Sequence, residues 1–152
     1  MFRGKFKHSL DEKGRVSLPV KFRESLRVRY GSEVLIITHL PECLVAYPVS
    51  EWKTLEERLL NLPFGIKETR EFLRYFIGST VECEPDKQGR ILIPQSLRDE
   101  IKVEREVVLL GMLNYFEIWH PLALEERFTK IKENFDEIMS VINPYLMRKE
   151  AV

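Results

Sequence analysis

A thirteen-residue segment occurs twice in this chain, over residues 11–23 and, 75 positions later, over residues 86–98. Aspartate, glycine, arginine, proline and a final arginine are identical at paired positions, and three further pairs match one apolar residue with another. An internal repeat of this kind indicates a duplicated supersecondary unit. Both copies must satisfy one fold, whereas only one copy needs a particular binding surface. Differences between the copies therefore point to function.

Each copy is predicted to belong to a unit of two strands, a helix and two more strands. Apolar and polar residues alternate from Phe2 to Leu10, which is the period of a half-buried strand. Turn residues at 11–15 should reverse the chain into a strand at 15–18, so we expect a local hairpin. Pro19 suits the first turn of a short helix. The other expected elements are strands 34–38, 44–47, 91–93, 107–110 and 116–119, and helices 51–60, 66–77 and 94–101.

A final helical stretch is expected over residues 122–139, ended by Asn143-Pro144. Its apolar residues are spaced by four and three positions, so they form one continuous stripe. Either the chain's own sheet or another subunit could cover this stripe, and both alternatives stay open. The stripe comprises Leu124, Phe128, Ile131, Phe135, Ile138 and Ile142.

The composition is that of an ordinary globular protein, with 44% hydrophobic and 32% charged residues. The sequence has neither an apolar run of the roughly 20 residues that cross a bilayer nor the apolar core of a secretory signal, so a soluble, cytoplasmic protein is expected. Cys43 and Cys83 should be reduced and buried. We find no nucleophile motif, phosphate-binding glycine loop or metal-ligand spacing, and the three histidines are expected to be ordinary packed or exposed residues. The sequence therefore predicts a protein that is not an enzyme and has neither a metal nor a cofactor.

Charge is distributed unevenly along the chain. The net charge is zero, but residues 1–29 contain nine lysines or arginines and only three acidic residues. This asymmetry favours a basic surface that binds a polyanion. Because the whole chain is neutral, a useful affinity for a polyanion is expected to need several chains that bind together.

Most basic residues of the first copy have no basic counterpart in the second. The unmatched pairs are Arg3 and Gly78, Lys5 and Thr80, Lys7 and Glu82, Lys13 and Gln88, Lys21 and Ser96, and Arg29 and Glu104. A merely solvated face is the alternative explanation. It is disfavoured because no acidic residue interleaves with the first three cations along their strand. We therefore expect DNA contacts from Arg3, Lys5, Lys7, Lys13, Arg15 and Lys21, with Arg15 also paired to Asp11 because Arg90 matches it.

Several segments together resemble the bacterial MraZ proteins, over essentially the full length. They are the opening Met1-Phe2-Arg3-Gly4, the two Asp-x-x-x-Arg motifs with their Gly-Arg-apolar-x-apolar-Pro continuations, and the segments 44–48 and 116–119. The residues that carry over as the family motif are Asp11, Gly14, Arg15, Asp86, Gly89 and Arg90.

This resemblance implies an α+β fold of two fused AbrB-like, swapped-hairpin barrel units with flanking helices, assembled into a ring-shaped homo-oligomer. We expect residues 1–78 to read DNA and residues 79–152 to build the assembly. The resemblance also implies a sequence-specific regulator, generally a repressor, that binds short direct repeats of double-stranded DNA in the promoter of the division and cell-wall gene cluster and associates with the nucleoid. Three alternatives stay open: a protein-interaction scaffold, a nonspecific nucleoid-associated protein, and an enzyme acting on nucleic acid, against which the missing cofactor and nucleophile motifs argue.

Overall fold

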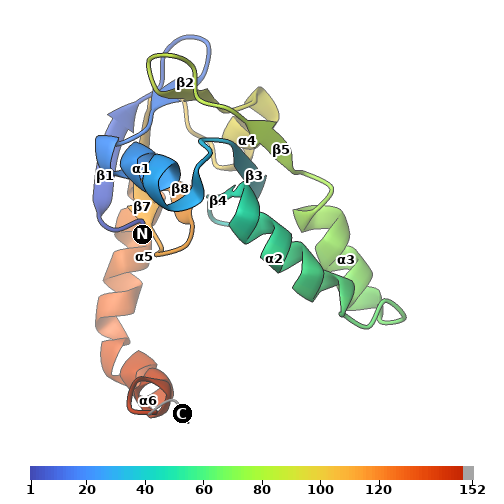
Figure 1. The fold of residues 1–152 in the computed structure, drawn as a ribbon. Helices are drawn as coiled ribbons and strands as arrows, with labels where there is room; N and C mark the ends of the chain where they lie inside the picture. Colours follow the sequence, from blue (N-terminus) through green and yellow to red (C-terminus); the bar gives the residue numbers. More distant parts are fainter. Residues whose placement is uncertain (149–152) are drawn as a thin grey trace. The chain divides into compact units, whose positions relative to one another are not determined.

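The computed structural model describes residues 1–148, which belong to two compact units, Met1–Pro121 and Leu122–Val152. Figure 1 traces the chain from β1 to α6. Within the described residues, strands form a six-stranded antiparallel sheet in the order β1-β7-β8-β4-β3-β5 and a separate two-stranded sheet, β2-β6. The strands are β1 (Lys5–Ser9), β2 (Arg15–Ser17), β3 (Leu35–His39), β4 (Leu44–Pro48), β5 (Val81–Cys83), β6 (Arg90–Leu92), β7 (Glu106–Gly111) and β8 (Phe116–Trp119).

The helices of the first unit lie between these strands. They are α1 (Val20–Ser25), the π-helix η1 (Leu26–Tyr30), α2 (Val49–Leu60), α3 (Lys67–Phe76) and α4 (Gln95–Glu100). Pro19 and Pro94 are the N-caps of α1 and α4, where the missing proline N–H costs no hydrogen bond. The observed mixture of an antiparallel sheet and helices confirms the predicted α+β class. None of the helices in residues 1–148 is both long and apolar enough to span a membrane.

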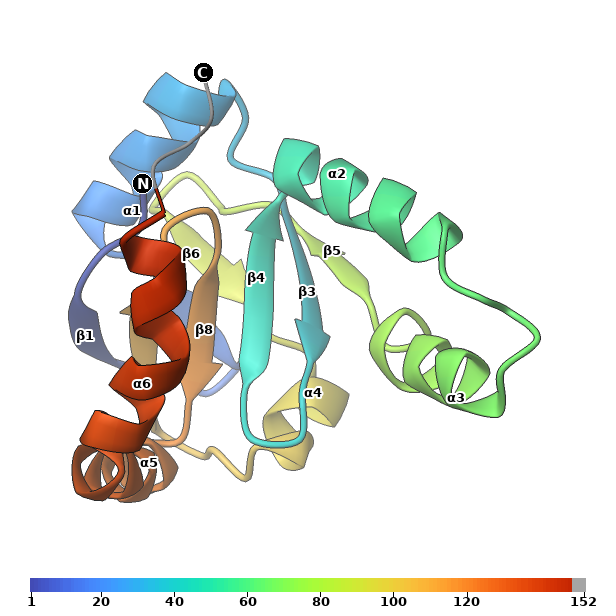
Figure 2. The same cartoon turned by 90° about the horizontal axis from the view of Figure 1, so that it is seen from below.

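The two copies are related by an internal pseudo-twofold axis. The counterparts are β1 and β5, β2 and β6, β3 and β7, and β4 and β8. When each strand of the six-stranded sheet is replaced by its counterpart and the sheet is read from the opposite edge, the same strand order results. The register obeys the same exchange, because Phe6 pairs with Leu109 as Val81 pairs with Ile37. Figure 2 shows the resulting arrangement, with β8, β4, β3 and β5 side by side.

The expected local hairpin at residues 11–15 is wrong. The chain does turn there, but β1 pairs with β7 and β2 pairs with β6, so both strands find their partners in the other copy. The turn chemistry is local, whereas the pairing is decided by which strands bury their apolar faces together. The two copies therefore exchange strands within one chain.

The offset between the copies changes along the chain. It is 75 for β2 and β6, where Val16 pairs with Ile91, but 72 for the following strands, where Ile36 pairs with Tyr47 as Val108 pairs with Trp119. The first copy contains the π-helix η1 at this point, whereas α4 of the second copy ends directly. Arg29 lies in that extra segment, so Glu104 is not its structural counterpart in the second copy, contrary to the prediction.

One core serves both copies. It includes Phe2 and Phe22 of the first copy and Phe116 of the second, with ring centroids 5.0–5.3 Å apart. Each copy's apolar residues are thus buried partly by the other copy, which is the reason that neither half has a separate core.

The second unit contains two helices, α5 (Pro121–Glu133) and α6 (Phe135–Leu146), instead of the single expected helix. The helix breaks at Asn134, whose φ of −108° and ψ of 16° are not helical. Pro144 does not end the helix as predicted, because it lies in the last turn, where its missing N–H removes only one hydrogen bond. Residues of the predicted stripe are substantially exposed, namely Phe128, Ile131, Phe135, Ile138 and Ile142.

Candidate nucleic-acid interface

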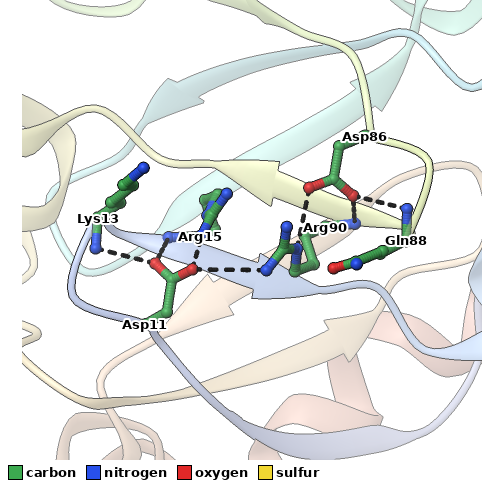
Figure 3. A network of polar contacts seen from close by, with 6 residues as sticks. All are labelled: Asp11, Lys13, Arg15, Asp86, Gln88 and Arg90. Atoms are coloured by element: carbon green, nitrogen blue, oxygen red, sulfur yellow. Dashed lines mark hydrogen bonds and ion pairs between the residues drawn. The ribbon is translucent and has the colours of Figure 1, made fainter.

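The first Asp-x-x-x-Arg motif forms a closed turn held by one carboxylate (Figure 3). Oδ1 of Asp11 accepts the backbone N–H groups of Lys13 at 2.9 Å and of Arg15 at 2.8 Å. Oδ2 accepts Nε–H of the Arg15 guanidinium at 2.6 Å. An aspartate that bonds the backbone two residues ahead stabilises a turn in which Gly14 takes a φ of +86°. The motif therefore fixes the position of the loop that carries Lys13.

The second motif repeats this geometry. Oδ1 of Asp86 accepts the N–H groups of Gln88 at 2.9 Å and of Arg90 at 3.0 Å, and Oδ2 accepts Nε–H of Arg90 at 2.9 Å. The two turns also meet, because Nη1 of Arg90 lies 3.9 Å from Oδ2 of Asp11. The Asp and Arg residues that are identical in the two copies thus close each turn and meet between the two turns, which the β2–β6 pairing brings together (Figure 3).

Hydrogen bonds to both carboxylates lower their pKa values below the ordinary value of 3.8. The main cause is the backbone N–H of Arg15 for Asp11 and of Arg90 for Asp86, and the guanidinium groups act in the same direction. A carboxyl with a lowered pKa in the folded state stabilises the fold above its ordinary pKa, and this contribution disappears as the pH falls through the lower folded-state value.

We therefore expect the difference in unfolding free energy between wild type and the double variant Asp11→Asn with Asp86→Asn to shrink as the pH falls below about 3.8. The amide cannot be protonated, so the variant lacks this part of the acid sensitivity. Urea unfolding of both proteins at pH 7, 4 and 3 measures the effect. A constant difference across the three pH values would contradict it.

The glycine and the final arginine of each copy contact each other across the pseudo-twofold axis. A Cβ on Gly14 would lie 2.4 Å from Cζ of Arg98, and a Cβ on Gly89 would lie 2.5 Å from Nη1 of Arg23. The backbones bond reciprocally as well, since the Leu18 N–H donates to the Gly89 carbonyl as the Ile93 N–H donates to that of Gly14. These contacts explain why both residue types are identical in the two copies.

Gly14→Ala and Gly89→Ala are each expected to lower the free energy of unfolding by about 1–3 kcal/mol, because both glycines have positive φ values and an arginine lies where the methyl group would be. Chemical denaturation measures the loss. Gly65→Ala is the matched control, since nothing lies within 4 Å of its Cβ position. Equal stability of all three variants would contradict this account of the turn.

Most of the predicted DNA-contacting side chains are exposed. Arg3 precedes β1, Lys5 and Lys7 project from β1, Lys13 lies in the turn and Lys21 lies on α1. Arg15 is half-buried, and its Nε is bonded to Asp11. Five of the six predicted residues thus face solvent in the first copy.

One argument from the sequence needs correction. Lys7 has an acidic neighbour after all, because β7 runs beside β1 and places an oxygen of Glu106 3.4 Å from Nζ of Lys7. The two side chains are 60% and 54% exposed, so the pair contributes little stability. It does lower the local positive charge at Lys7. Sequence reasoning missed Glu106 because the β1–β7 pairing joins residues that are about one hundred positions apart.

Lys5 on β1 and Lys21 on α1 are both exposed. Their counterparts at the offset of 75 are Thr80 and Ser96, which line a common pocket together with His39 of the first copy. Because the two copies share strand register, we expect the two lysines to lie near each other in the same way. We define the Lys5–Lys21 patch as these two side chains. Two ammonium groups close together suit the contact of adjacent phosphates.

The remaining polar candidates have structural surroundings. Nδ1 of His8 lies 2.5 Å from the Ser17 carbonyl oxygen, at the place where Sγ of Cys83 donates to the Leu92 carbonyl in the second copy. Both cysteines are buried, as predicted, and burial raises the pKa of Cys83 to about 11. Within residues 1–148 there is no group of three or more His, Cys, Asp or Glu side chains that could hold a metal ion.

Comparison with known proteins gives a consistent result. The family model described as "MraZ protein, putative antitoxin-like" matches residues 1–75 and again residues 76–140. A Transcriptional regulator MraZ from Pediococcus pentosaceus is 44% identical over 138 residues, which are 91% of this chain and 94% of that protein. Proteins of the same name from Caldicellulosiruptor saccharolyticus, at 45% identity over 93% of this chain and 92% of that protein, and from Caldanaerobacter subterraneus, at 43% over 91% and 94%, are also similar.

Proposed function

The chain belongs to the MraZ family, and on that premise we propose that it is a DNA-binding transcriptional regulator. The relatives are named as transcriptional regulators. The observation that carries the proposal to particular residues is the exposed basic surface of the first copy, centred on the Lys5–Lys21 patch, which the second copy lacks.

The chemistry of this surface suits a duplex. Exposed lysines neutralise phosphates, and a turn held rigid by Asp11 presents Lys13 beside β1 at little conformational cost. Arg15 is held through its Nε, and a guanidinium offers further N–H groups for a base edge or a phosphate. The proposed contact residues are Arg3, Lys5, Lys7, Lys13, Arg15 and Lys21.

We assign DNA reading to the first copy, residues 1–78, and assembly to the second copy, residues 79–152. The finer features extend the same proposal: two AbrB-like barrel units, a ring-shaped homo-oligomer, direct-repeat operators, repression of the division and cell-wall gene cluster, and nucleoid association. A ring supports affinity physically, because linked weak sites raise the effective concentration of each other. Rotationally related subunits also match direct repeats in DNA.

Fluorescence anisotropy with labelled duplexes tests the binding part of the proposal. We expect the protein to bind DNA from the region upstream of its own gene more tightly than a scrambled duplex of the same composition. Affinity for both should fall log-linearly with rising salt concentration, because bound lysines displace counterions. Equal affinity for both duplexes would support a nonspecific nucleoid-associated protein, and no salt-sensitive binding would support a protein-interaction scaffold.

A further inference from the structure

A polar pocket lined by β3 of the first copy and by residues of the second copy has no role in the function proposed above. Its volume is about 280 Å³, and it lies among the end of β3, the first turn and the last residue of α4, and the segment that follows α3. The size is close to the lower limit for small-molecule sites, about 300 Å³. Its lining is His39, Gly78, Ser79, Thr80, Ser96, Leu97 and Glu100.

A buried histidine presents an unsatisfied nitrogen there. His39 is 6% exposed, and its ring stacks on Tyr75 with centroids 3.9 Å apart. Nε2 lies 2.9 Å from the Tyr75 carbonyl oxygen, which only accepts, so Nε2 carries the hydrogen and donates it. In the neutral imidazole Nδ1 is then an acceptor, and within residues 1–148 it finds no hydrogen-bond partner. A buried acceptor without a donor lowers the stability of the fold, so a ligand that donates a hydrogen bond to Nδ1 would be stabilised there.

One carboxylate lies near the unsatisfied nitrogen, and a helix C-terminus borders the pocket. Oε2 of Glu100 lies 3.7 Å from Nδ1 of His39, and the Glu100 side chain is 52% exposed. Residues 78–80 of the lining directly follow the C-terminus of α3, where the helix dipole is negative. Burial and then the Glu100 carboxylate raise the pKa of Tyr75, which is consistent with a negative local potential. The pocket therefore favours a donor that is also a cation.

The place that corresponds to this pocket by the pseudo-twofold axis carries positive charge instead of negative charge. Lys5 stands for Thr80 and Lys21 for Ser96 at the offset of 75, and Ser25 stands for Glu100. His39 corresponds to Gly111 at the offset of 72, and there the backbone of Arg3 fills the space, since a Cβ would meet its nitrogen at 2.4 Å. Of the two places related by the pseudo-twofold axis, one thus has two lysines that suit anions, and the other has an open pocket with His39 and Glu100 as acceptors.

We propose that this pocket binds a small organic cation with N–H donors, an ammonium or guanidinium compound. One N–H group donates to Nδ1 of His39, and the cationic charge pairs with Glu100. The hydroxyl groups of Ser79, Thr80 and Ser96 accept further hydrogen bonds. This inference is independent of DNA binding, because none of the residues that hold the cation belongs to the DNA-contacting set.

Equilibrium dialysis of the full-length protein with radiolabelled putrescine tests the proposal at constant ionic strength. We expect saturable binding of one putrescine per chain, displaced by methylguanidinium but not by 1,4-butanediol, which has the same chain length without charge. Glu100→Gln should weaken binding at least tenfold. Ser96→Lys should abolish it, because it restores the lysine of the first copy beside the pocket.

Two matched variants exclude a general charge effect. Glu104→Gln removes an exposed carboxylate near α4 that does not line the pocket, and Gln95→Lys adds a positive charge one residue from Ser96. Both should bind putrescine like wild type, and circular dichroism confirms folding of all variants. The proposal is overturned by absent binding, by equal displacement with 1,4-butanediol, by equal effects of the paired variants, or by Zn²⁺ binding without putrescine binding. A fraction of bound putrescine that falls as the protein concentration rises would also overturn the proposal. It would show that a side chain of a second protein molecule occupies the pocket.

Discussion

Phe22→Ala is expected to lower the free energy of unfolding by about 3–5 kcal/mol. The side chain is 1% exposed, and its ring lies 5.1 Å from that of Phe2, 5.3 Å from that of Phe6 and 5.0 Å from that of Phe116. Because Phe116 comes from the second copy, the substitution leaves a cavity between the copies. The loss should therefore destabilise both copies together.

Urea unfolding followed by circular dichroism and by tryptophan fluorescence measures this effect. We expect the two signals to change in one transition, since a shared core unfolds cooperatively. Phe64→Ala is the matched control, because Phe64 is 47% exposed, and its loss should change stability by less than about 0.5 kcal/mol. Two separate transitions, or equal losses for both variants, would show that the copies have independent cores.

Lys5→Ala with Lys21→Ala is expected to weaken DNA binding about 10- to 100-fold at low salt and to reduce the slope of log affinity against log salt by about 2. Both lysines are exposed, and their counterparts Thr80 and Ser96 line one pocket, so we expect the two lysines to share one surface. Loss of two phosphate contacts releases fewer counterions. Fluorescence anisotropy over a series of salt concentrations gives both quantities, and size-exclusion chromatography should show an unchanged elution volume.

Controls separate the patch from net charge. Lys53→Ala with Lys67→Ala removes the same charge from two exposed lysines on α2 and α3 and should leave DNA affinity nearly unchanged. Adding Lys7→Ala to Lys5→Ala should weaken binding less than adding Lys21→Ala, because Glu106 lies beside Lys7. If the control pair weakens binding as much as the patch pair, long-range attraction and not a specific surface explains the affinity.

The local elements were largely predictable from the sequence, and the pairing between them was not. Period-two alternation and proline positions located β1, α1 and α4, because those signals act within a few residues. Exchange of strands between the copies depends on contacts far apart in sequence, so the hairpin predicted at residues 11–15 was wrong. The break at Asn134 has no strong local signal, and the α5–α6 pair was therefore predicted as one helix.

The same distinction applies to the candidate sites. Comparing the copies singled out Lys5 and Lys21, since a residue that only one copy has is visible without a structure. The expectation that these two lysines share one surface, and the acid beside Lys7, needed the sheet order. The buried acceptor on His39 was not predictable, because the sequence placed this residue between two strands and gave no sign of Tyr75 or Glu100 nearby.

A transcriptional reporter driven by the region upstream of the gene tests the central claim most directly. Wild type and the variant Lys5→Ala with Lys21→Ala are expressed at equal levels, and reporter output is compared with that of cells lacking the protein. We predict that the wild-type protein lowers the reporter output and that the variant leaves it unchanged. Equal output with both proteins and without either would contradict transcriptional regulation through the first copy.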